Sequence, residues 1–486
     1  MRWSGSLALG AGAAGALSGF RLDAAGGIFR ELARELQGTV VTPSRPAYPQ
    51  AKLLVNSRFD GTHPRAIVYC ESSEDVERTI HWARKHAIPL VPRCGGHSYA
   101  GYSTTSAGVV VDVTRMNKVH VSSGKASVGA GARLIDVYAA LARHGRTIPA
   151  GSCPSVGIAG LTLGGGVGFA GRKLGLTSDN LAGLSLVSAR GKLLACGPGE
   201  HADLYWACRG GGGGNFGIAT SFRFRTHPAP DVAYYEIAWP WSDAGEVVRA
   251  WQDFAPHAPD ALFSTLFMAT SAPKGGGSEP VVGSGGQFFG TEAELYSLIA
   301  PLVATGTPIR VTVGTLSYLD AVLHWAGCHP FNQCQAVRRF RFKGKSDYVD
   351  VPLPKEAIAT LLTGLEANQA DGSLGRGELI FDSYGGAINR VPKEETAFVH
   401  RSSLFSIQYF STWTGDGKDD LRWIRNLYAA MRPFVSGFAY QNYLDPDLRS
   451  WRHAYYGSNL RRLAHVKRIH DPHGFFHFPR SIPRHV

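Results

Sequence analysis

Glycine is the residue that most constrains how this chain can fold. It supplies 59 of the 486 residues, roughly 12% where about 7% is typical. Much of it gathers in residues 92–99, 151–168 and 209–217. Glycine is favoured where the backbone takes a positive φ or where a ligand approaches the backbone closely. The three stretches therefore predict loops whose backbone N–H groups surround a large ligand, such as one that carries a pyrophosphate.

The length and composition indicate a globular protein of two or three domains, with room to bury a large cofactor. Hydrophobic residues make up 44% of the chain and charged residues 18%, which excludes a disordered protein. The net charge of +12 comes from scattered Lys and Arg with no long basic block, so nucleic acid is not an expected partner. We attribute the charge to a partly cationic surface around an anionic cofactor.

The cysteines argue for little structural cross-linking. There are seven of them and no CxxC pair. This number and spacing disfavour both a zinc site and a disulfide scaffold, so no metal is predicted. Cys328 and Cys334 are close enough in sequence for one small-loop disulfide, a pairing that the sequence alone leaves open.

A mildly apolar stretch near the N-terminus, up to about Leu17, is typical of the hydrophobic region of an export signal. It is too short and too rich in glycine for a membrane-spanning helix. A twin-arginine signal would suit a protein that folds around its cofactor before export, but only Arg2 is present. We expect residues 1–26 to be a leader and the protein to be periplasmic or extracellular; the alternative is an unstructured cytoplasmic leader. No other segment is expected to cross a membrane.

Residues 65–230 alternate predicted helices with predicted strands. Val76, Ile80 and Ala83 follow helical spacing after a capping signal formed by Ser72 and Asp75. The pattern further predicts strands at residues 89–92 and 109–113, a helix at 134–141, a hairpin at 184–194 and a half-buried strand at 218–226.

A His-Pro-Ala-Pro break at residues 227–230 changes the pattern to longer strands and amphipathic helices, one of them with Val247 and Trp251 on its apolar face. Residues 273–286 are rich in Gly, Ser and Pro, which predicts a mobile loop that needs no function. We therefore divide the chain into a leader (1–26), a cofactor domain (27–230, core about 60–230), a substrate domain (231–438) and a C-terminal segment (439–486) that returns to the cofactor domain.

The glycine stretches do not form a Rossmann site, because a GxGxxG between a first strand and a helix is missing near the N-terminus. The sequences RCGGHS at 93–98, GSCPSVG at 151–157, GGGVG at 164–168 and GGGGGNFG at 210–217 together resemble the PCMH-type flavin-binding domain of the vanillyl-alcohol oxidase superfamily, and within it the berberine bridge enzyme-like oxidases. The resemblance covers about residues 45–230 and 440–486. It implies an α+β fold, with a two-part FAD-binding domain and a substrate domain whose antiparallel sheet is covered by helices.

The resemblance also implies how FAD is held. In the family, the histidine of GGHS is bonded to the flavin 8α-methyl group and the cysteine of GxCPxVG to flavin C6, so His97 and Cys153 are the implied attachment residues of a bicovalent FAD. Outside this context, His97 would be a turn residue and Cys153 a small buried one. Two tethers favour a high reduction potential, so that even a poor hydride donor such as an alcohol can be oxidised.

Other residues are implied to hold FAD through backbone amides and a few side chains. They are Arg93, Cys94, Gly95, Gly96, Ser98, Tyr99, Gly157, Gly160, Gly164, Gly165, Gly168, Asp179, Asn180, Gly217, Ile218 and Asn442. An anionic pyrophosphate on such backbone amides needs little added charge.

The catalytic base is implied to come from the C-terminal segment. The sequence YQNYLD at residues 440–445 is similar to the family's Y-x-N-Y-x-D stretch, whose second tyrosine removes the substrate proton in carbohydrate and alcohol oxidases. Tyr443 is therefore the implied base, with packing at a domain interface as its alternative role. A phenol with a pKa near about 10 is a weak base at neutral pH, so a neighbour or the flavin must lower that pKa.

Two further predicted strands are expected to face the same cavity. One carries Asp382 and Tyr384 and the other carries Gln408. In relatives, the aspartate or tyrosine of the first strand assists the base, and the position of Gln408 can be a glutamate that serves as base in the alkaloid-cyclising enzymes. Glutamine cannot accept a proton usefully, which disfavours oxidative ring closure and favours alcohol oxidation with Tyr443.

The implied reaction is oxidation of an alcohol by hydride transfer to FAD, with O2 reduced to H2O2. Val156 matches a small aliphatic position that the family links to oxygen access, which favours an oxidase over a dehydrogenase. The candidate substrates are a sugar or oligosaccharide hydroxyl and a secondary alcohol of a glycosylated natural product. Trp239, Trp241, Trp325 and Trp413 suit ring stacking with either, although most could equally be core residues.

Two alternatives stay open from the sequence. One is an oxidative cyclase of a secondary-metabolite pathway on the same scaffold, and the other is a flavin-binding protein without catalysis. The sequence predicts no oligomeric state.

Overall fold

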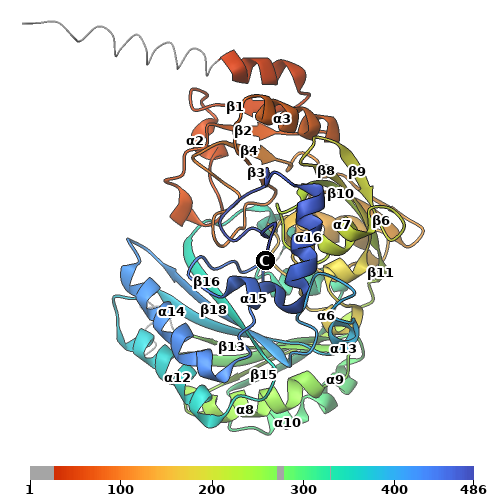
Figure 1. Ribbon diagram of the computed structural model, residues 1–486. Coiled ribbons are helices and arrows are strands. Elements are labelled where there is room, and N and C mark those ends of the chain that lie inside the picture. The colour runs from red at the N-terminus through yellow and green to blue at the C-terminus, as the bar shows by residue number, and fades with distance from the viewer. Residues whose placement is uncertain (1–26, 271–278, 329) are drawn as a thin grey trace, which may run out of the picture.

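The computed structural model describes residues 27–486, apart from 271–278 and 329. Three larger sheets organise this part of the chain: a four-stranded and a five-stranded sheet in the N-terminal half, and a seven-stranded sheet in the C-terminal half (Figure 1). The predicted leader, residues 1–26, lies outside the described residues. Within the described part, every helix is too short or too polar to cross a bilayer.

The four-stranded sheet delivers the first glycine stretch. Its order is β1 (Thr39–Val41), β2 (Ala66–Tyr69), β4 (Val109–Asp112) and β3 (Leu90–Arg93), with β2, β4 and β3 parallel. Helix α3 (Ser73–Lys85) links β2 to β3, and the Ser72 hydroxyl accepts a hydrogen bond from the Asp75 amide at 3.3 Å, as the capping signal predicts. The glycine stretch begins at the carboxyl end of β3, where α/β sheets bind ligands.

The five-stranded sheet carries the other two glycine stretches on its connections. It is antiparallel, in the order β5 (Val119–Ser122), β6 (Lys125–Gly129), β10 (Gly217–Arg225), β8 (Leu181–Ser188) and β9 (Leu193–Cys196). The predicted hairpin is confirmed as β8 paired with β9. Helices α4 (Leu134–Ala142) and α7 (Ala202–Ala207) contact this sheet, whereas α6 (Gly171–Leu174) contacts β13 of the seven-stranded sheet; α5 (Ile158–Leu163) begins inside the second glycine stretch.

The seven-stranded sheet is antiparallel throughout and forms the substrate domain. Its order is β15 (Arg310–Leu316), β12 (Val232–Trp239), β14 (Val281–Phe288), β13 (Leu262–Ala269), β17 (Arg376–Ser383), β18 (Phe405–Trp413) and β16 (Arg341–Val349). Figure 1 shows α8 (Ala244–Phe254), α10 (Ala300–Val303), α12 (Lys355–Ala370) and α14 (Lys418–Met431) below this sheet, with the cofactor domain above it. The expected α+β architecture of helices on an antiparallel sheet is confirmed.

The prediction of a mobile loop at residues 273–286 is wrong for its second half. Residues 281–288 form β14, a strand inside the sheet that pairs with β12 on one side and β13 on the other. Glycine normally weakens a strand, but two full ladders of hydrogen bonds hold this one. Residues 273–278 of the predicted loop lie outside the described residues.

The C-terminal segment contacts the predicted cofactor domain. Helix α16 (Leu460–His470) lies beside α7, and α15 (Trp451–Tyr456) packs against α16 above the seven-stranded sheet (Figure 1). The buried Lys467 ammonium donates to the Asn215 carbonyl at 2.5 Å and to Asp471 at 2.7 Å, and the Gln441 amide donates to the Gly210 carbonyl at 2.5 Å. The third glycine stretch is therefore fixed by the end of the chain.

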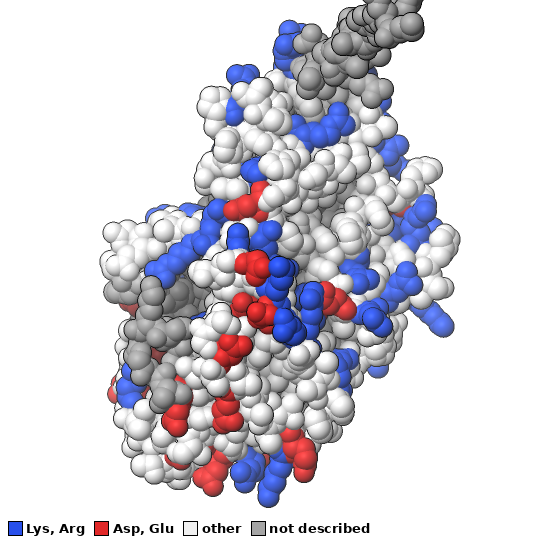
Figure 2. All heavy atoms as spheres, turned by 90° about the vertical axis from the view of Figure 1, so that its left-hand side faces the viewer, with Lys and Arg blue, Asp and Glu red and all other residues white. Residues whose placement is uncertain are grey.

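Two sequence expectations concern cross-linking and charge. Cys328 and Cys334 form a disulfide, which settles the pairing that the sequence left open. On the face that Figure 2 shows, Lys and Arg side chains are interspersed with Asp and Glu rather than gathered into one continuous basic surface.

Candidate active site

Two glycine loops bring His97 and Cys153 to one place. The loop after β3 and the loop before α5 touch so closely that a Cβ added at Gly95 would meet the Ser155 carbonyl oxygen at 2.8 Å, and one added at Gly157 would overlap the Cys94 thiol. His97 Nε2 lies 2.9 Å from Ser155 Oγ, two residues beyond Cys153. His97 is half-buried and Cys153 exposed. The structure thus juxtaposes the two predicted attachment residues.

The surface around this pair leaves room for a large planar group. A Cβ built on the exposed Gly160 would meet no atom within 4 Å. Around it, Val156, Leu161 and Val167 are only half-buried apolar side chains. A patch of uncovered apolar and backbone surface next to His97 and Cys153 is what an isoalloxazine ring requires, so the residues present fit FAD. Burial lowers the pKa of His97 to about 4, so the imidazole there is neutral at pH 7.

The C-terminal segment packs against the triple glycine at residues 164–166. A Cβ at Gly164 would overlap the Asn442 amide, which donates to the Leu161 carbonyl at 3.0 Å and to the Tyr440 hydroxyl at 2.8 Å. The same hydroxyl accepts the Gly166 N–H at 2.9 Å. Gly165 and Gly166 have φ values of 115° and 86°, a region that side chains disfavour. Asn442, predicted to bind FAD, thereby positions the loop.

Several of the predicted cofactor residues have side chains committed elsewhere. Arg93 forms a buried ion pair with Asp112 and donates to the Ala51 carbonyl at 2.7 Å. The Cys94 thiol donates to the Ala130 carbonyl at 3.0 Å, and burial raises its pKa to about 12. The Ser98 hydroxyl accepts a hydrogen bond from the Tyr102 amide. Three further predicted residues are closely packed: Gly168 lies against the Ala150 carbonyl, and Gly217 and Ile218 are buried in β10 against β8. Any contact of these residues with a cofactor would come from the backbone.

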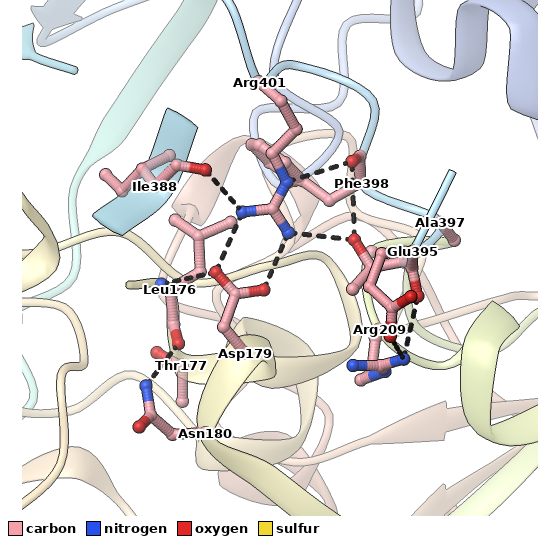
Figure 3. A network of polar contacts seen from close by, with 12 residues as sticks. Leu176, Thr177, Asp179, Asn180, Arg209, Ile388, Glu395, Ala397, Phe398 and Arg401 are labelled. Carbon is pink, nitrogen blue, oxygen red and sulfur yellow. Dashed lines mark hydrogen bonds and ion pairs between the residues drawn. The ribbon is translucent and has the colours of Figure 1, made fainter. Parts of the chain in front are cut away.

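Asp179 and Asn180, also predicted to hold FAD, instead lie at a junction of the two domains (Figure 3). The Asp179 carboxylate accepts two hydrogen bonds from the Arg401 guanidinium at 2.7 and 2.8 Å and one from the Leu176 amide at 2.9 Å. Asn180 donates to the Leu174 and Leu176 carbonyls. Their side chains hold the turn after the triple glycine and tie it to the substrate domain. Sequence reasoning missed Arg401, whose loop carries no motif.

The catalytic candidates meet on the cofactor-facing side of the large sheet. Ile380 is directly opposite Gln408, and Asp382 opposite Ser406, so Asp382 and Gln408 point to the same face. The Gln408 amide donates to the Tyr99 hydroxyl at 2.8 Å. Tyr99 stacks on Tyr443, with 4.8 Å between ring centroids and 16° between planes. Residues from three distant parts of the chain therefore build one cluster.

Burial and charge shape the protonation of this cluster. Burial raises the pKa of Asp382 to about 6. It also raises the pKa of Tyr443, an effect to which Tyr99, Asp382 and Cys153 add electrostatically. Burial likewise raises the pKa of Tyr99, and the hydrogen bond from Gln408 opposes that rise. Asp382 is therefore the member of the cluster whose pKa lies nearest to neutral pH.

Tyr384 belongs to a buried cluster against which Tyr443 packs. Strand β17 ends at Ser383, so Tyr384 falls just beyond the strand on which the sequence places it. It is fully buried, and its hydroxyl lies 3.0 Å from that of Tyr348. The structure therefore places Tyr384 behind Tyr443, within the protein core.

The segment that carries Tyr443 is anchored by a buried ion cluster. Asp445 accepts hydrogen bonds from Lys343 and Lys345 of β16, and all three side chains are almost completely buried. Asp447 lies 3.2 Å from Lys343 and 2.8 Å from Arg425. The sequence contained one signal of this cluster, the two lysines two positions apart at 343 and 345, which sequence reasoning missed.

The comparisons with known proteins agree with this geometry. An FAD binding domain family matches residues 64–197, and the family described as "Berberine and berberine like" matches residues 439–483. The FAD-linked oxidoreductase YgaK of Bacillus subtilis (strain 168) is 35% identical over 459 residues, which cover 92% of this chain and 97% of that protein.

Two solved structures extend the likeness to the whole fold. BBE-like 1 of Physcomitrella patens superposes with a TM-score of 0.86 at 32% identity, covering 94% of this chain and 99% of that one. A chitooligosaccharide oxidase superposes with a TM-score of 0.83 at 26% identity, covering 95% and 99%. The glycine loops, the returning C-terminal segment and these matches together lead to one conclusion: the chain is an FAD-linked oxidoreductase of the berberine bridge enzyme-like family.

Proposed function

We propose that this enzyme oxidises an alcohol to a carbonyl compound and reduces O2 to H2O2. One observation carries the proposal: two stacked phenols, Tyr99 and Tyr443, lie within electrostatic reach of Cys153 and of the Asp382 carboxylate. An alcohol that gives up a hydride must also give up its hydroxyl proton, and this cluster offers oxygen atoms to take it. The relative named chitooligosaccharide oxidase supports a sugar hydroxyl as the substrate group.

In this proposal, FAD is bonded to both His97 and Cys153. The contact between their loops, the neutral imidazole and the exposed thiol support the two attachments. Gly160 and the backbone of residues 164–166 would bound the ring, with Asn442 and Tyr440 holding that loop in place. When bound, the isoalloxazine accepts a hydride from the substrate carbon and passes two electrons to O2.

The chain's own groups handle the proton. Because its raised pKa keeps Tyr443 a neutral phenol at neutral pH, Tyr443 passes its own proton to Asp382 as it takes the hydroxyl proton of the alcohol. Asp382 can accept that proton, because a carboxylate with a pKa of about 6 is ionised at neutral pH. Gln408 orients Tyr99 through the 2.8 Å hydrogen bond, and Tyr99 fixes the ring plane of Tyr443 by stacking. The overall balance is one hydride and one proton lost by the alcohol, and two electrons and two protons gained by O2.

Tyr99 is a second candidate for the base, on a specific observation. A hydrogen bond donated to a phenol oxygen stabilises the phenolate, and Tyr99 receives one from Gln408. Exchanging each phenol for phenylalanine separates the two assignments. With Tyr443 as base, Tyr443→Phe should lower kcat by about 10²- to 10⁴-fold and Tyr99→Phe much less.

Gln408 disfavours the rival function, oxidative ring closure. The Gln408 amide is a donor to Tyr99 and cannot serve as a carboxylate base. Mass spectrometry of products separates the two reactions by connectivity, since alcohol oxidation converts C–OH to C=O and forms no ring.

The experiment that tests the proposed function is a screen of sugars and of hydroxylated natural products. Flavin bleaching without oxygen reports substrate oxidation, and peroxide release in air reports the acceptor. We expect bleaching with at least one alcohol and one H2O2 per carbonyl formed. Absence of bleaching across the panel would favour a non-catalytic flavin-binding protein. Bleaching without peroxide would identify a dehydrogenase.

We further propose that the protein is exported. The disulfide between Cys328 and Cys334 supports this, because such bonds persist in oxidising compartments. Fractionation of the native host, with detection of the mature N-terminus, tests it.

A further inference from the structure

The attachment loop, residues 153–157, begins at the predicted flavin-bonding cysteine and packs on the first turn of α4. The Leu134 amide, at the start of this helix, donates to the Val156 carbonyl at 2.9 Å. The next amide, that of Ile135, donates to the Pro154 carbonyl at 3.1 Å. The first amides of a helix have no partner within it, so the loop caps α4. The position of α4 therefore helps to fix the position of the loop.

A loop of the substrate domain packs against the same turn of α4. It follows α11 (Tyr318–Trp325) and is closed by the disulfide between Cys328 and Cys334. The Ile135 side chain, which is fully buried, packs in one cluster with Leu323 and both half-cystines. Ile135 thus joins two parts of the molecule, because its amide bonds to the attachment loop and its side chain packs on the disulfide.

A polar contact fixes the same junction. Arg133, the residue before α4, donates to the Gln335 carbonyl at 3.1 Å and to the Gln335 Oε1 at 2.5 Å. Gln335 directly follows Cys334. The backbone of Arg133 also forms an isolated β-bridge with Gly157 of the attachment loop. Two residues of one turn, one polar and one apolar, therefore connect the attachment loop to the disulfide-closed loop.

The loop that carries His97 is held by other contacts. It follows β3, it packs on the attachment loop at Gly95, and its Gly96 carbonyl accepts the Val55 amide at 3.2 Å. These partners lie in the cofactor domain. A disturbance of the disulfide-closed loop should therefore displace Cys153 more than His97.

We propose that the disulfide-closed loop is a positioning element for flavin attachment: it holds α4, and through α4 it holds the Cys153 thiol where flavin C6 binds. This inference rests on the proposed bicovalent FAD and adds that one of its two bonds depends on the disulfide. The bond joins Cys153 Sγ to C6 with loss of one hydrogen from each atom, and O2 takes both hydrogens and leaves as H2O2. Bond formation is sensitive to small displacements of the reacting atoms. Without the disulfide, the bond to His97 would therefore form alone.

Peptide mapping tests this dependence. After acid denaturation and digestion, mass spectrometry gives the share of Cys153 peptides that carry flavin. Cys328→Ser combined with Cys334→Ser should lower this share about threefold or more, while the His97 peptide keeps its flavin. Arg133→Met, which removes the polar contact and leaves the disulfide intact, should lower it less. Arg143→Met, at an exposed arginine that follows the other end of α4, is the matched control and should leave it unchanged.

Amide hydrogen exchange gives a readout that needs no flavin bond. In a Cys153→Ala background, no attached flavin can hold the loop in place. The Leu134 and Ile135 amides bond to the attachment loop, so their exchange should become about tenfold faster when both half-cystines are replaced by serine. Arg143→Met in the same background should leave their exchange unchanged.

The outcomes separate this inference from the proposed function. Full attachment at Cys153 in the double serine variant would overturn the positioning role and leave the proposed function standing. A wild type without flavin at Cys153 would overturn the bicovalent attachment, and the inference with it. If the double variant does not fold or loses both bonds, Arg133→Met decides. An attached share equal to that of Arg143→Met would then overturn the inference, and a lower share would support it.

Discussion

Glycine has opposite uses in the two halves of this enzyme. In the cofactor loops it allows unusual backbone: Gly96, Gly165 and Gly166 have φ of 68°, 115° and 86°, and neighbouring chains approach where a side chain would stand. In β14, Gly283 and Gly285 are part of an ordinary extended ladder. There the missing side chains make room for the aromatic rings of Phe267 and Trp325, which pack against the strand. The comparison teaches that a glycine-rich stretch shapes either the backbone or the space beside it.

The largest effect is expected where glycine shapes the backbone. Gly166→Val forces a branched side chain into the positive-φ region and against Thr177, which should lower the free energy of unfolding by about 3 kcal/mol or more. It should also displace Tyr440, whose hydroxyl accepts the Gly166 N–H. Flavin absorbance per protein and chemical unfolding measure both losses.

The matched control is Gly145→Ala. Gly145 also has a positive φ, of 62°, but a Cβ there meets nothing within 4 Å. We expect a loss of about 1 kcal/mol from the backbone alone, with full flavin content. A Gly166 variant that kept its flavin and its stability would contradict the claim that the C-terminal segment must pack against the triple glycine.

Substitution of Asp382, which lies on the seven-stranded sheet, is expected to have an intermediate effect on activity. Burial raises its pKa to about 6, so the carboxylate protonates as the pH falls through 6. If it accepts the proton from Tyr443, kcat/KM should fall about tenfold per unit below pH 6, and Asp382→Asn should remove this acidic limb. A variant with an unchanged pH profile would exclude Asp382 from the proton path.

The same substitution should act on stability with the opposite sign. The folded-state pKa of Asp382 lies above its ordinary value, so the folded state favours the neutral acid and loses stability as the pH rises through 6. Asp382→Asn should therefore raise the Tm at pH 8 and leave it nearly unchanged at pH 4. Thermal unfolding at the two pH values measures this difference, and a Tm that fell at pH 8 would contradict it.

The smallest effect is expected where glycine only clears space. Gly283→Ala keeps the extended backbone and requires the Phe267 ring, more than a third exposed, to move. We expect the free energy of unfolding to change by less than about 1 kcal/mol. Urea unfolding gives the stability change, and one as large as that of Gly166→Val would erase the contrast between the two uses of glycine.

The sequence predicts the cofactor side of the molecule well and the substrate side poorly. The cap at Ser72, the hairpin of β8 and β9, the meeting of the His97 and Cys153 loops and the return of the C-terminal segment all follow from local motifs. The sequence predicts a loop at residues 281–286, because propensity says nothing of the two neighbouring strands that hold these residues in β14. Partners distant in sequence, such as Arg401 with Asp179 or Lys345 with Asp445, follow only from topology.

The tryptophans illustrate the same limit. Trp239 and Trp413 are core residues, and Trp241 donates to Glu366 outside the site. Trp325, the fourth residue predicted for ring stacking, packs over Gly285 and stacks on Phe169. Residue type alone does not separate these roles, because each depends on neighbours that are distant in the sequence.

The central claim is that FAD is bonded to the protein at two points, His97 and Cys153. Acid precipitation followed by intact-protein mass spectrometry tests it most directly. The account predicts that the wild type, His97→Ala and Cys153→Ala each retain yellow colour and the mass of one FAD, whereas the double variant releases its flavin into the supernatant. Release of flavin from the wild type, or retention by the double variant, would contradict the account.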